Sequence, residues 1–394
     1  MKYILIVLDG IADEPIEELD GKTPLMAAHT PNMDMLARSG IVGAVMNTPP
    51  GMDPGSDITN MSILGYDPRI YYRGRAAIEA VGLGIPLETT QIAFRTNLVT
   101  TDGERILDSA GGHVSTDEAK RLIKCINHQF GSDKIKFYTG VSYRHIMLWD
   151  GGSDAVHCTA PYKIHDLPFD KYLPNGEGSE MLNQMICESY ELLDNHPVNT
   201  HRRNKGKLPA NMIWFWAQGR EPEMPSFKSR HGVSGSVIAA VDLIRGLGRL
   251  TGLRVVNVPG ATGYIDTNYK GKGEYALREL KRDDFVWVHV EAADEASHEG
   301  NLAAKIEAIE KSDDLVLGTI LKGLQADKQP FKILLLPDHP TSIAAKTHSN
   351  APSPFVIYSS EEVHDGARAF DETIVAASEV RIKDGYTLIE RLFA

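Results

Sequence analysis

The 394-residue sequence has few cysteines, few aromatic residues and an excess of acidic over basic residues. Its three cysteines, Cys125, Cys158 and Cys187, lie far apart and form no C-x-x-C pair, which argues against a disulfide framework or a cysteine zinc knuckle. The apolar run at 3–8 is too short for a secretory signal or a membrane span. The net charge of −12 disfavours nucleic acid and anionic membranes as partners. We therefore expect a cytoplasmic protein.

Apolar runs typical of buried parallel strands are present, and three of them end in a carboxylate. These runs are 3–8 before Asp9, 284–290 before Glu291 and Asp294, and 332–336 before Asp338. In open α/β sheets, ligands bind at the carboxyl ends of the strands. The three strand ends are therefore the first place to look for a functional site.

Helical patterns alternate with these strands, which predicts an α/β fold with a mostly parallel sheet. The expected helices cover 33–39, 236–247 and 302–324. The middle of the chain differs, because 91–98 and 143–149 alternate like half-solvated strands around a helix at 115–130. We expect a smaller inserted α+β domain at 86–206, carried by a larger domain made of 1–85 and 207–394.

The segment Gly55-Ser56-Asp57 combines a glycine, a hydroxyl and a carboxylate before a short helical pattern. A serine that opens a helix would place the helix N–H groups near any phosphate that the serine carries. The alternative is an ordinary helix N-cap, since serine and aspartate are both common in that position.

Histidines accompany two of the strand-end carboxylates. Asp294 and His298 are four residues apart and would face the same way on a helix, although surface Asp–His pairs with that spacing are frequent. Asp338 is followed directly by His339, and His348 lies nine residues further on. A single histidine at a strand end is more often structural, but all of these side chains would meet at one edge of the sheet.

Taken together, seven residues form a mixed oxygen and nitrogen ligand set large enough for two divalent ions: Asp9, Ser56, Asp294, His298, Asp338, His339 and His348. Such ligands suit Mn²⁺ or Zn²⁺ better than Ca²⁺, and Mg²⁺ is also possible. Two ions could activate a serine hydroxyl and hold the entering and leaving oxygens of a phosphoryl displacement. The set therefore predicts metal-dependent phosphoryl transfer.

The ordered motifs resemble the alkaline phosphatase superfamily, and within it the cofactor-independent phosphoglycerate mutases of the archaeal type. The motifs that carry the resemblance are Leu8-Asp9-Gly10, 22–25 with 30–34, Gly55-Ser56-Asp57, 64–68, 294–298 and Pro337-Asp338-His339. They span nearly the whole chain. The resemblance implies an alkaline-phosphatase-like three-layer α/β/α domain, with the inserted domain binding the substrate.

By this resemblance Ser56 is the phosphoryl acceptor. Asp9, Asp338 and His339 would join it around one metal, while Asp294, His298 and His348 would hold the second. The family pattern also points to substrate-binding residues in the insert, namely His113, Arg144, Arg202 and Arg203. Further basic candidates are Arg73, Arg75, Arg95, Lys228 and Arg245.

The activity implied is the glycolytic interconversion of 3-phosphoglycerate and 2-phosphoglycerate through a phosphoserine, without bisphosphoglycerate. The partner would be a small phosphorylated sugar acid, and a homo-oligomer is possible. Asn60 departs from the archaeal pattern, in which a histidine follows the Gly-Ser-Asp motif, and resembles a bacterial branch. That likeness leaves a homoserine kinase-like activity open, and a metal-dependent phosphatase is the other alternative. No G-x-x-x-x-G-K-[ST] motif is present for a nucleotide.

Overall fold

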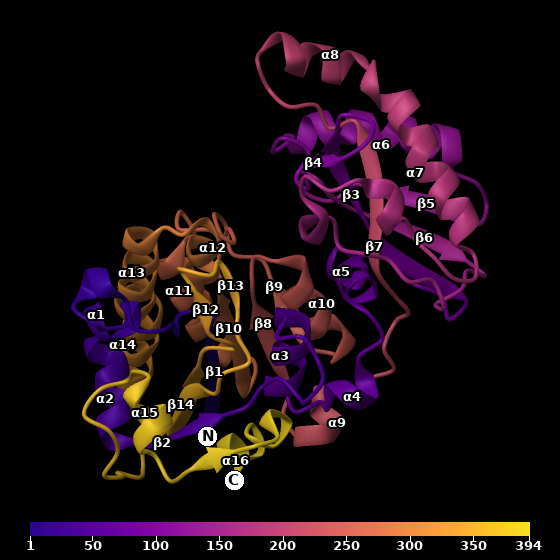
Figure 1. Cartoon of the computed structure of the whole chain (residues 1–394). Coiled ribbons are helices and arrows are strands. Elements are labelled where there is room, and N and C mark those ends of the chain that lie inside the picture. The colour runs from indigo at the N-terminus through magenta and orange to yellow at the C-terminus, as the bar shows by residue number, and fades with distance from the viewer. The chain divides into compact units, whose positions relative to one another are not determined.

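The computed structural model describes residues 1–394 as two compact units (Figure 1). The first unit consists of Met1–Tyr72 and Glu223–Ala394, and the second of Arg73–Pro222. The second unit is therefore an insertion into the chain of the first. No helix combines the length and the apolar character needed to cross a membrane.

The first unit is built on an eight-stranded sheet in the order β15-β2-β14-β11-β1-β10-β8-β9. Its strands are β1 (Lys2–Leu8), β2 (Ile41–Val45), β8 (Gly235–Ile238), β9 (Arg254–Val256), β10 (Phe285–Val290), β11 (Phe331–Leu336), β14 (Ser353–Ser359) and β15 (Arg381–Ile382). Only β14 runs antiparallel to its neighbours. Since β1 pairs in parallel with both β10 and β11, the three strands that end in carboxylates are adjacent.

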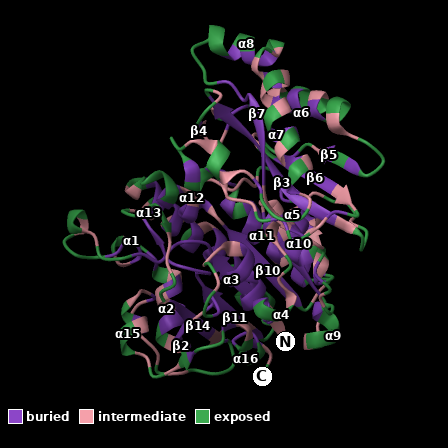
Figure 2. Ribbon diagram, turned by 45° about the vertical axis from the view of Figure 1, so that its right-hand side comes forward, coloured by how far each residue is buried: buried purple, intermediate pink, exposed green.

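Both faces of this sheet are covered, as the continuous apolar runs predict (Figure 2). In β1, Ile4 and Ile6 join the core beneath α2, α11 and α14, while Leu5 and Val7 point to the other face and are equally buried. The longer helices of the unit are α2 (Pro31–Ser39), α3 (Ser56–Ile63), α10 (Asp242–Leu250), α11 (Tyr269–Leu280), α12 (Ala292–Glu299), α13 (Leu302–Lys311) and α14 (Gly318–Asp327). The shorter ones are α1 (Pro24–Ala27), α4 (Pro68–Tyr71), α9 (Phe227–His231), α15 (Thr373–Ala377) and α16 (Glu390–Phe393). The expected α/β fold with a mostly parallel sheet is confirmed.

Two of the expected helices differ from the structure. The pattern at 236–247 contains the end of strand β8 and the start of α10, so the expectation of one helix is wrong there. A short buried strand and a helix segment share the same apolar composition, which is why the pattern did not separate them. The expected helix at 302–324 is present, but a π-helical turn at Ser312–Leu317 joins α13 to α14.

The second unit contains a five-stranded antiparallel sheet with helices on both faces. Its elements are α5 (Arg75–Gly82), β3 (Gln91–Thr101), β4 (Ile106–Asp108), α6 (Thr116–Phe130), β5 (Ile135–Tyr138), β6 (Arg144–Asp150), α7 (Ser179–Asp194), α8 (Pro197–Asn204) and β7 (Met212–Gly219). The long strand β3 lies in the centre and pairs with β4, β6 and β7.

The unit extends beyond the expected limits of 86 and 206, because α5 and β7 pack with β3 inside it. Strand β3 is buried along almost its whole length, so the expectation of a half-solvated strand is wrong. The reason is that α5 covers the face of β3 opposite to the core formed with α6 and α7. The assignment of 86–206 as a substrate-binding domain stays a prediction.

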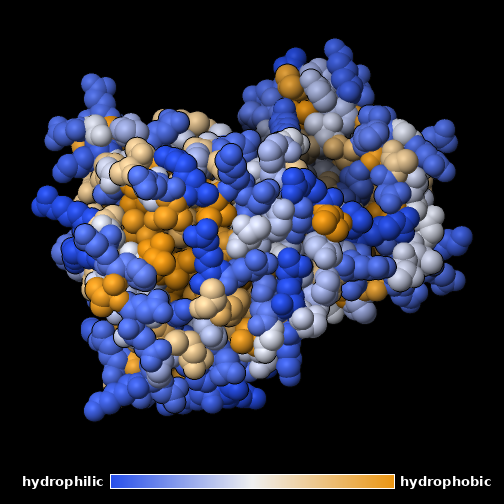
Figure 3. Space-filling view, turned by 90° about the horizontal axis from the view of Figure 1, so that it is seen from below, coloured by the Kyte–Doolittle hydropathy of each residue, from blue (hydrophilic) through white to orange (hydrophobic).

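The surface seen in Figure 3 is mostly hydrophilic, as expected for a chain in which 24% of the residues are charged. Apolar side chains gather in one larger area and in several smaller ones on this face. Single apolar side chains scattered over a surface are normal and do not by themselves mark a site.

Candidate metal centre

Three aspartates meet at the carboxyl ends of adjacent strands in the first unit. Asp9 follows β1, Asp338 follows β11, and Asp294 lies in the first turn of α12 just after β10. All three are at least nine-tenths buried. Gly10 makes this close packing possible, because a Cβ atom at that position would lie 2.7 Å from Cα of Asp294. The expected meeting of strand-end carboxylates is confirmed.

Asp9, Asp338 and His339 form one group of candidate ligands. His339 Nε2 lies 3.3 Å from Asp338 Oδ2 and 3.7 Å from Asp9 Oδ1. Ser56 Oγ lies 3.3 Å from the same His339 nitrogen, at the N-terminal end of α3. We call this group, with Ser56, the first subsite. It matches the first ligand set predicted from the sequence.

Helix α3 orients the Asp338 carboxylate as well as Ser56. Thr59 Oγ1 and Asn60 Nδ2 donate hydrogen bonds to Asp338 Oδ2 at 3.1 and 2.9 Å. Asn60 Nδ2 also donates to the carbonyl oxygen of Ser56 at 3.0 Å. Asn60, the position that departs from the archaeal pattern, therefore connects the serine to a candidate metal ligand.

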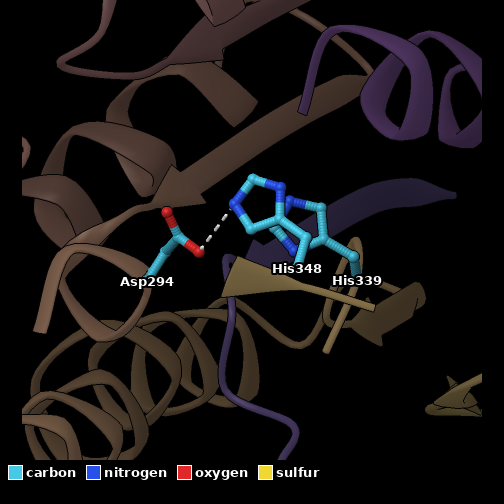
Figure 4. A group of neighbouring side chains, drawn as sticks. All are labelled: Asp294, His339 and His348. Carbon is cyan, nitrogen blue, oxygen red and sulfur yellow. Dashed lines mark ion pairs between the residues drawn. The ribbon is translucent and has the colours of Figure 1, made fainter. Parts of the chain in front are cut away.

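Asp294 and His348 form a second group of candidate ligands together with His339, and the exposed His298 lies beside this group. We call Asp294, His298 and His348 the second subsite. Asp294 Oδ2 lies 3.2 Å from His298 Nε2. Its Oδ1 lies 3.4 Å from His348 Nε2, and Figure 4 shows this pair beside His339. His348 belongs to the short strand β13 (Thr347–His348), which pairs with β12 (Thr341–Ser342). Its ring stacks on that of His339, with the centroids 3.8 Å apart, so the two subsites are contiguous.

The outer nitrogens of His298 and His348 are held by backbone carbonyls. His298 Nδ1 lies 3.0 Å from the oxygen of Lys346, and His348 Nδ1 lies 2.8 Å from that of Pro54. A carbonyl oxygen only accepts hydrogen bonds, so both Nδ1 atoms carry the proton. Both Nε2 atoms therefore point inward, 3.0 Å from one another. Two such nitrogens need a shared proton or a cation, and this arrangement is typical of metal-binding histidines.

The electrostatics of the centre also suit cations. Burial, followed by the charges of Asp338 and Asp294, raises the pKa of Asp9 well above its ordinary value. Asp9 Oδ1 is buried without a hydrogen-bond partner. Burial alone would raise the pKa of Asp294, but its contacts with His298 and His348 hold it well below the ordinary value. Burial likewise opposes a charge on His298, yet Asp294 raises its pKa to about 9. Oxygen and imidazole donors in this environment fit divalent ions.

His289 also contacts this centre, although it is not among the residues predicted from the sequence. His289 Nε2 lies 3.3 Å from Asp9 Oδ2, and burial lowers the pKa of the ring to about 3. Glu291 joins His289 and Asp9 in a further group of candidate ligands. The buried Lys272 donates to the carbonyl oxygen of His289 at 2.9 Å, and burial lowers its pKa to about 8. The sequence feature that could have identified His289 is its place as a polar residue near the carboxyl end of an otherwise apolar strand.

The candidates in the second unit have different surroundings. Arg202 is buried, and its guanidinium donates to Glu118 Oε2 at 2.8 Å and to the carbonyl oxygens of Leu208, Gly111 and Gly112. These bonds favour a structural role. Arg203 is partly exposed and pairs with Asp194. Their roles as substrate clamps stay predictions.

His113 and Arg144 are exposed. His113 follows two glycines and has a left-handed backbone with φ of 52°. Arg95, by contrast, is buried, contacts Glu79 Oε2 at 3.0 Å and stacks over Trp216, and burial lowers its pKa to about 10. His113 and Arg144, like Arg203, lie at the surface, where an external anion can reach them.

Comparison with known proteins gives consistent results. A family model described as 2,3-bisphosphoglycerate-independent phosphoglycerate mutase matches residues 37–199. A probable enzyme of that name from Geobacter sulfurreducens is 45% identical, covering 100% of this chain and 99% of the relative, and one from Methanosarcina acetivorans is 46% identical with the same coverage. A solved structure of the cofactor-independent mutase from Thermoplasma acidophilum is 31% identical with a TM-score of 0.65, covering 100% and 99% of the two chains. A solved protein from Pyrococcus horikoshii is 30% identical with a TM-score of 0.83, covering 100% and 97%.

Proposed function

Since the chain belongs to the 2,3-bisphosphoglycerate-independent phosphoglycerate mutase family, we propose that it interconverts 3-phosphoglycerate and 2-phosphoglycerate through a phosphoserine on Ser56. The observation that carries this proposal is the position of Ser56 Oγ, 3.3 Å from His339 Nε2 in the group formed by the buried Asp9, Asp338 and His339. Bisphosphoglycerate is not required, because the serine itself holds the phosphoryl group between the two transfers.

Helix α3 supplies the positioning for both transfers. Ser56 is its first residue, so the unpaired N–H groups of the first turn lie next to the hydroxyl and favour a bound phosphate. Ser56 Oγ attacks phosphorus as the bond to the 3-hydroxyl oxygen breaks, and the 2-hydroxyl of the glycerate then removes the group from Ser56. Asn60 and Thr59 keep Asp338 fixed during this exchange through their hydrogen bonds to Oδ2.

The ligand sets of the two subsites suit a pair of divalent ions, Mn²⁺ or Zn²⁺, with Mg²⁺ also possible. Asp9, Ser56, Asp338 and His339 would hold one ion, and Asp294, His298 and His348 the other. When bound, such ions neutralise the phosphoryl oxygens and increase the acidity of the serine hydroxyl. The buried Asp9 oxygen without a partner is consistent with this occupancy.

The proposal is tested by ³¹P NMR of Mn²⁺-loaded protein with 3-phosphoglycerate and no added bisphosphoglycerate or nucleotide. Growth of the 2-phosphoglycerate signal without free phosphate would establish the mutase. Release of free phosphate would establish a phosphatase instead. Absence of conversion with metal bound would contradict the proposal, and homoserine with ATP would then be the next substrates.

Ser56→Ala should reduce turnover by at least about a thousandfold, because the phosphoryl acceptor is lost. Its metal content should stay close to two ions per chain, since the other six ligands remain. Ser62→Ala is the matched control, because Ser62 is a buried serine on the same helix outside both ligand groups. Turnover retained by Ser56→Ala, measured by the same ³¹P assay, would remove the serine from the nucleophile role.

A further inference from the structure

The hydroxyl of Thr341 lies between the two subsites. Thr341 Oγ1 is 2.6 Å from Asp294 Oδ1 in the second subsite and 3.2 Å from His339 Nδ1 in the first. Thr341 is completely buried, so water does not compete for these hydrogen bonds. A single hydroxyl therefore contacts a ligand of each subsite.

The directions of the two hydrogen bonds follow from the number of protons available. A hydroxyl carries one hydrogen, and a carboxylate can only accept. Thr341 therefore donates to Asp294, and its oxygen accepts from His339. His339 Nδ1 must then carry a proton, which leaves the lone pair on Nε2, the atom that faces Ser56 Oγ and Asp338.

His339 differs in this respect from the other two histidines of the centre. His298 and His348 are held through Nδ1 by backbone carbonyls, which no substitution of a side chain removes. His339 is held by a side-chain hydroxyl. Its orientation and tautomer therefore depend on the residue at position 341.

A buried ion pair fixes Thr341 in turn. Lys305 Nζ donates to Asp13 Oδ2 and to the carbonyl oxygen of Thr341, both at 2.7 Å. The backbone N–H of Thr341 also donates to the carbonyl oxygen of Ala12 at 3.0 Å. The loop after β1 and the loop after β11 are therefore tied together beneath the centre.

We propose that Thr341 is a positioning residue that holds His339 in its Nδ1-protonated form and orients Asp294, so that both subsites present their ligands to cations together. Without the Thr341 acceptor, the ring proton would move to Nε2, where Asp338 Oδ2 lies 3.3 Å away and can accept it. That proton would occupy the position that a cation needs. The effect on metal binding rests on the proposed function, whereas the tautomer does not.

The tautomer can be read directly by NMR on the metal-free protein with ¹⁵N-labelled histidine rings. Long-range proton–nitrogen correlation distinguishes a protonated from an unprotonated ring nitrogen, and His339→Gln identifies the His339 signals among the 14 histidines. The expected result is a protonated Nδ1 and an unprotonated Nε2. A wild-type spectrum with the proton on Nε2 alone would overturn the proposal without any variant at position 341.

Thr341→Val and Thr341→Ser form a matched pair, because valine keeps the shape and loses the hydroxyl while serine keeps the hydroxyl. In Thr341→Val the His339 proton should shift to Nε2, and in Thr341→Ser it should stay on Nδ1. An unchanged His339 tautomer in a folded Thr341→Val protein would overturn the proposal, whatever its metal affinity.

Calorimetric titration with Mn²⁺ gives the second readout. Loss of the outer hydrogen bonds of metal ligands typically weakens metal binding about 10- to 100-fold, and we expect a loss in that range for Thr341→Val and a much smaller one for Thr341→Ser. Equal Mn²⁺ affinities for the wild type and Thr341→Val would overturn the proposal that Thr341 helps both subsites to present their ligands to cations. If the wild type bound no Mn²⁺, the proposed function would fail while the tautomer result still stood.

Discussion

The candidate metal centre of the first unit and the Arg202 cluster of the second unit both contain buried charged side chains, but they differ in whether protein groups satisfy their hydrogen-bonding atoms. Every acceptor around Arg202 is part of its own unit, and the guanidinium donates to a carboxylate and three carbonyls. In the metal centre, Asp9 Oδ1 has no hydrogen-bond partner and two imidazole nitrogens face one another at 3.0 Å.

The difference indicates which buried charges stabilise the fold and which are arranged for a ligand. A buried charge that is paired and hydrogen-bonded needs nothing further, whereas one that is left unsatisfied costs free energy until a ligand binds. The residue type alone does not tell whether a buried arginine stabilises the fold or binds a ligand, since arginine is common in both phosphate sites and structural ion pairs.

Removal of a ligand from the metal centre should have the largest effect. Asp294→Ala should lower the metal content by about one ion per chain and reduce turnover by at least about a thousandfold, because the second subsite loses the carboxylate that contacts both of its histidines. Metal content by plasma mass spectrometry and the ³¹P assay check both effects.

The control for this change is Glu299→Ala, which removes an exposed carboxylate from the same helix outside the ligand groups. It should keep two ions and normal turnover. An unchanged metal content in Asp294→Ala would contradict the second subsite. The first unit would then offer no example there of buried charges arranged for a ligand.

Arg202→Met should act on stability. The change removes the Arg202 donor from Glu118, which keeps its hydrogen bonds from Ser115, and from three carbonyl oxygens, of which the Gly111 contact is buried. The free energy of unfolding should therefore fall by about 1–3 kcal/mol. Urea unfolding followed by tryptophan fluorescence reports on the unit through the buried Trp214. Arg203→Met, which removes a partly exposed pair, should cost about 1 kcal/mol or less. A stable Arg202→Met protein with a raised KM would instead assign Arg202 to the substrate.

The release of protons when Mn²⁺ binds should show a smaller effect of the same difference between the two groups. Asp294 holds the pKa of His298 at about 9 in the metal-free protein despite burial, so the ring is charged below that pH and a cation must displace its proton. Affinity for Mn²⁺ should therefore rise about tenfold per unit from pH 7 and level off near pH 9. Calorimetry in two buffers of different ionisation enthalpy should count about one proton more released at pH 7 by the wild type than by His298→Gln. Release unchanged in His298→Gln would contradict this assignment.

The sequence predicted the strand-end part of the centre well. Apolar runs that end in Asp9 and Asp338 can be recognised directly, and the parallel pairing of β1 with β10 and β11 brings their ends together. It predicted the second unit less well, because the burial of β3 depends on α5, which the expected domain boundary at 86 left outside that unit. Contacts between segments far apart in sequence leave no local signal.

The sequence by itself determined the α/β fold and the seven candidate ligands, Ser56 among them, because strand periodicity and side-chain chemistry are local properties. Only the tertiary structure decided that His289 contacts Asp9, that Arg202 is satisfied internally and that Thr341 joins Asp294 to His339. A hydrogen bond requires its donor and acceptor to lie within about 3 Å, and loops far apart in the chain are brought that close only by the packed fold.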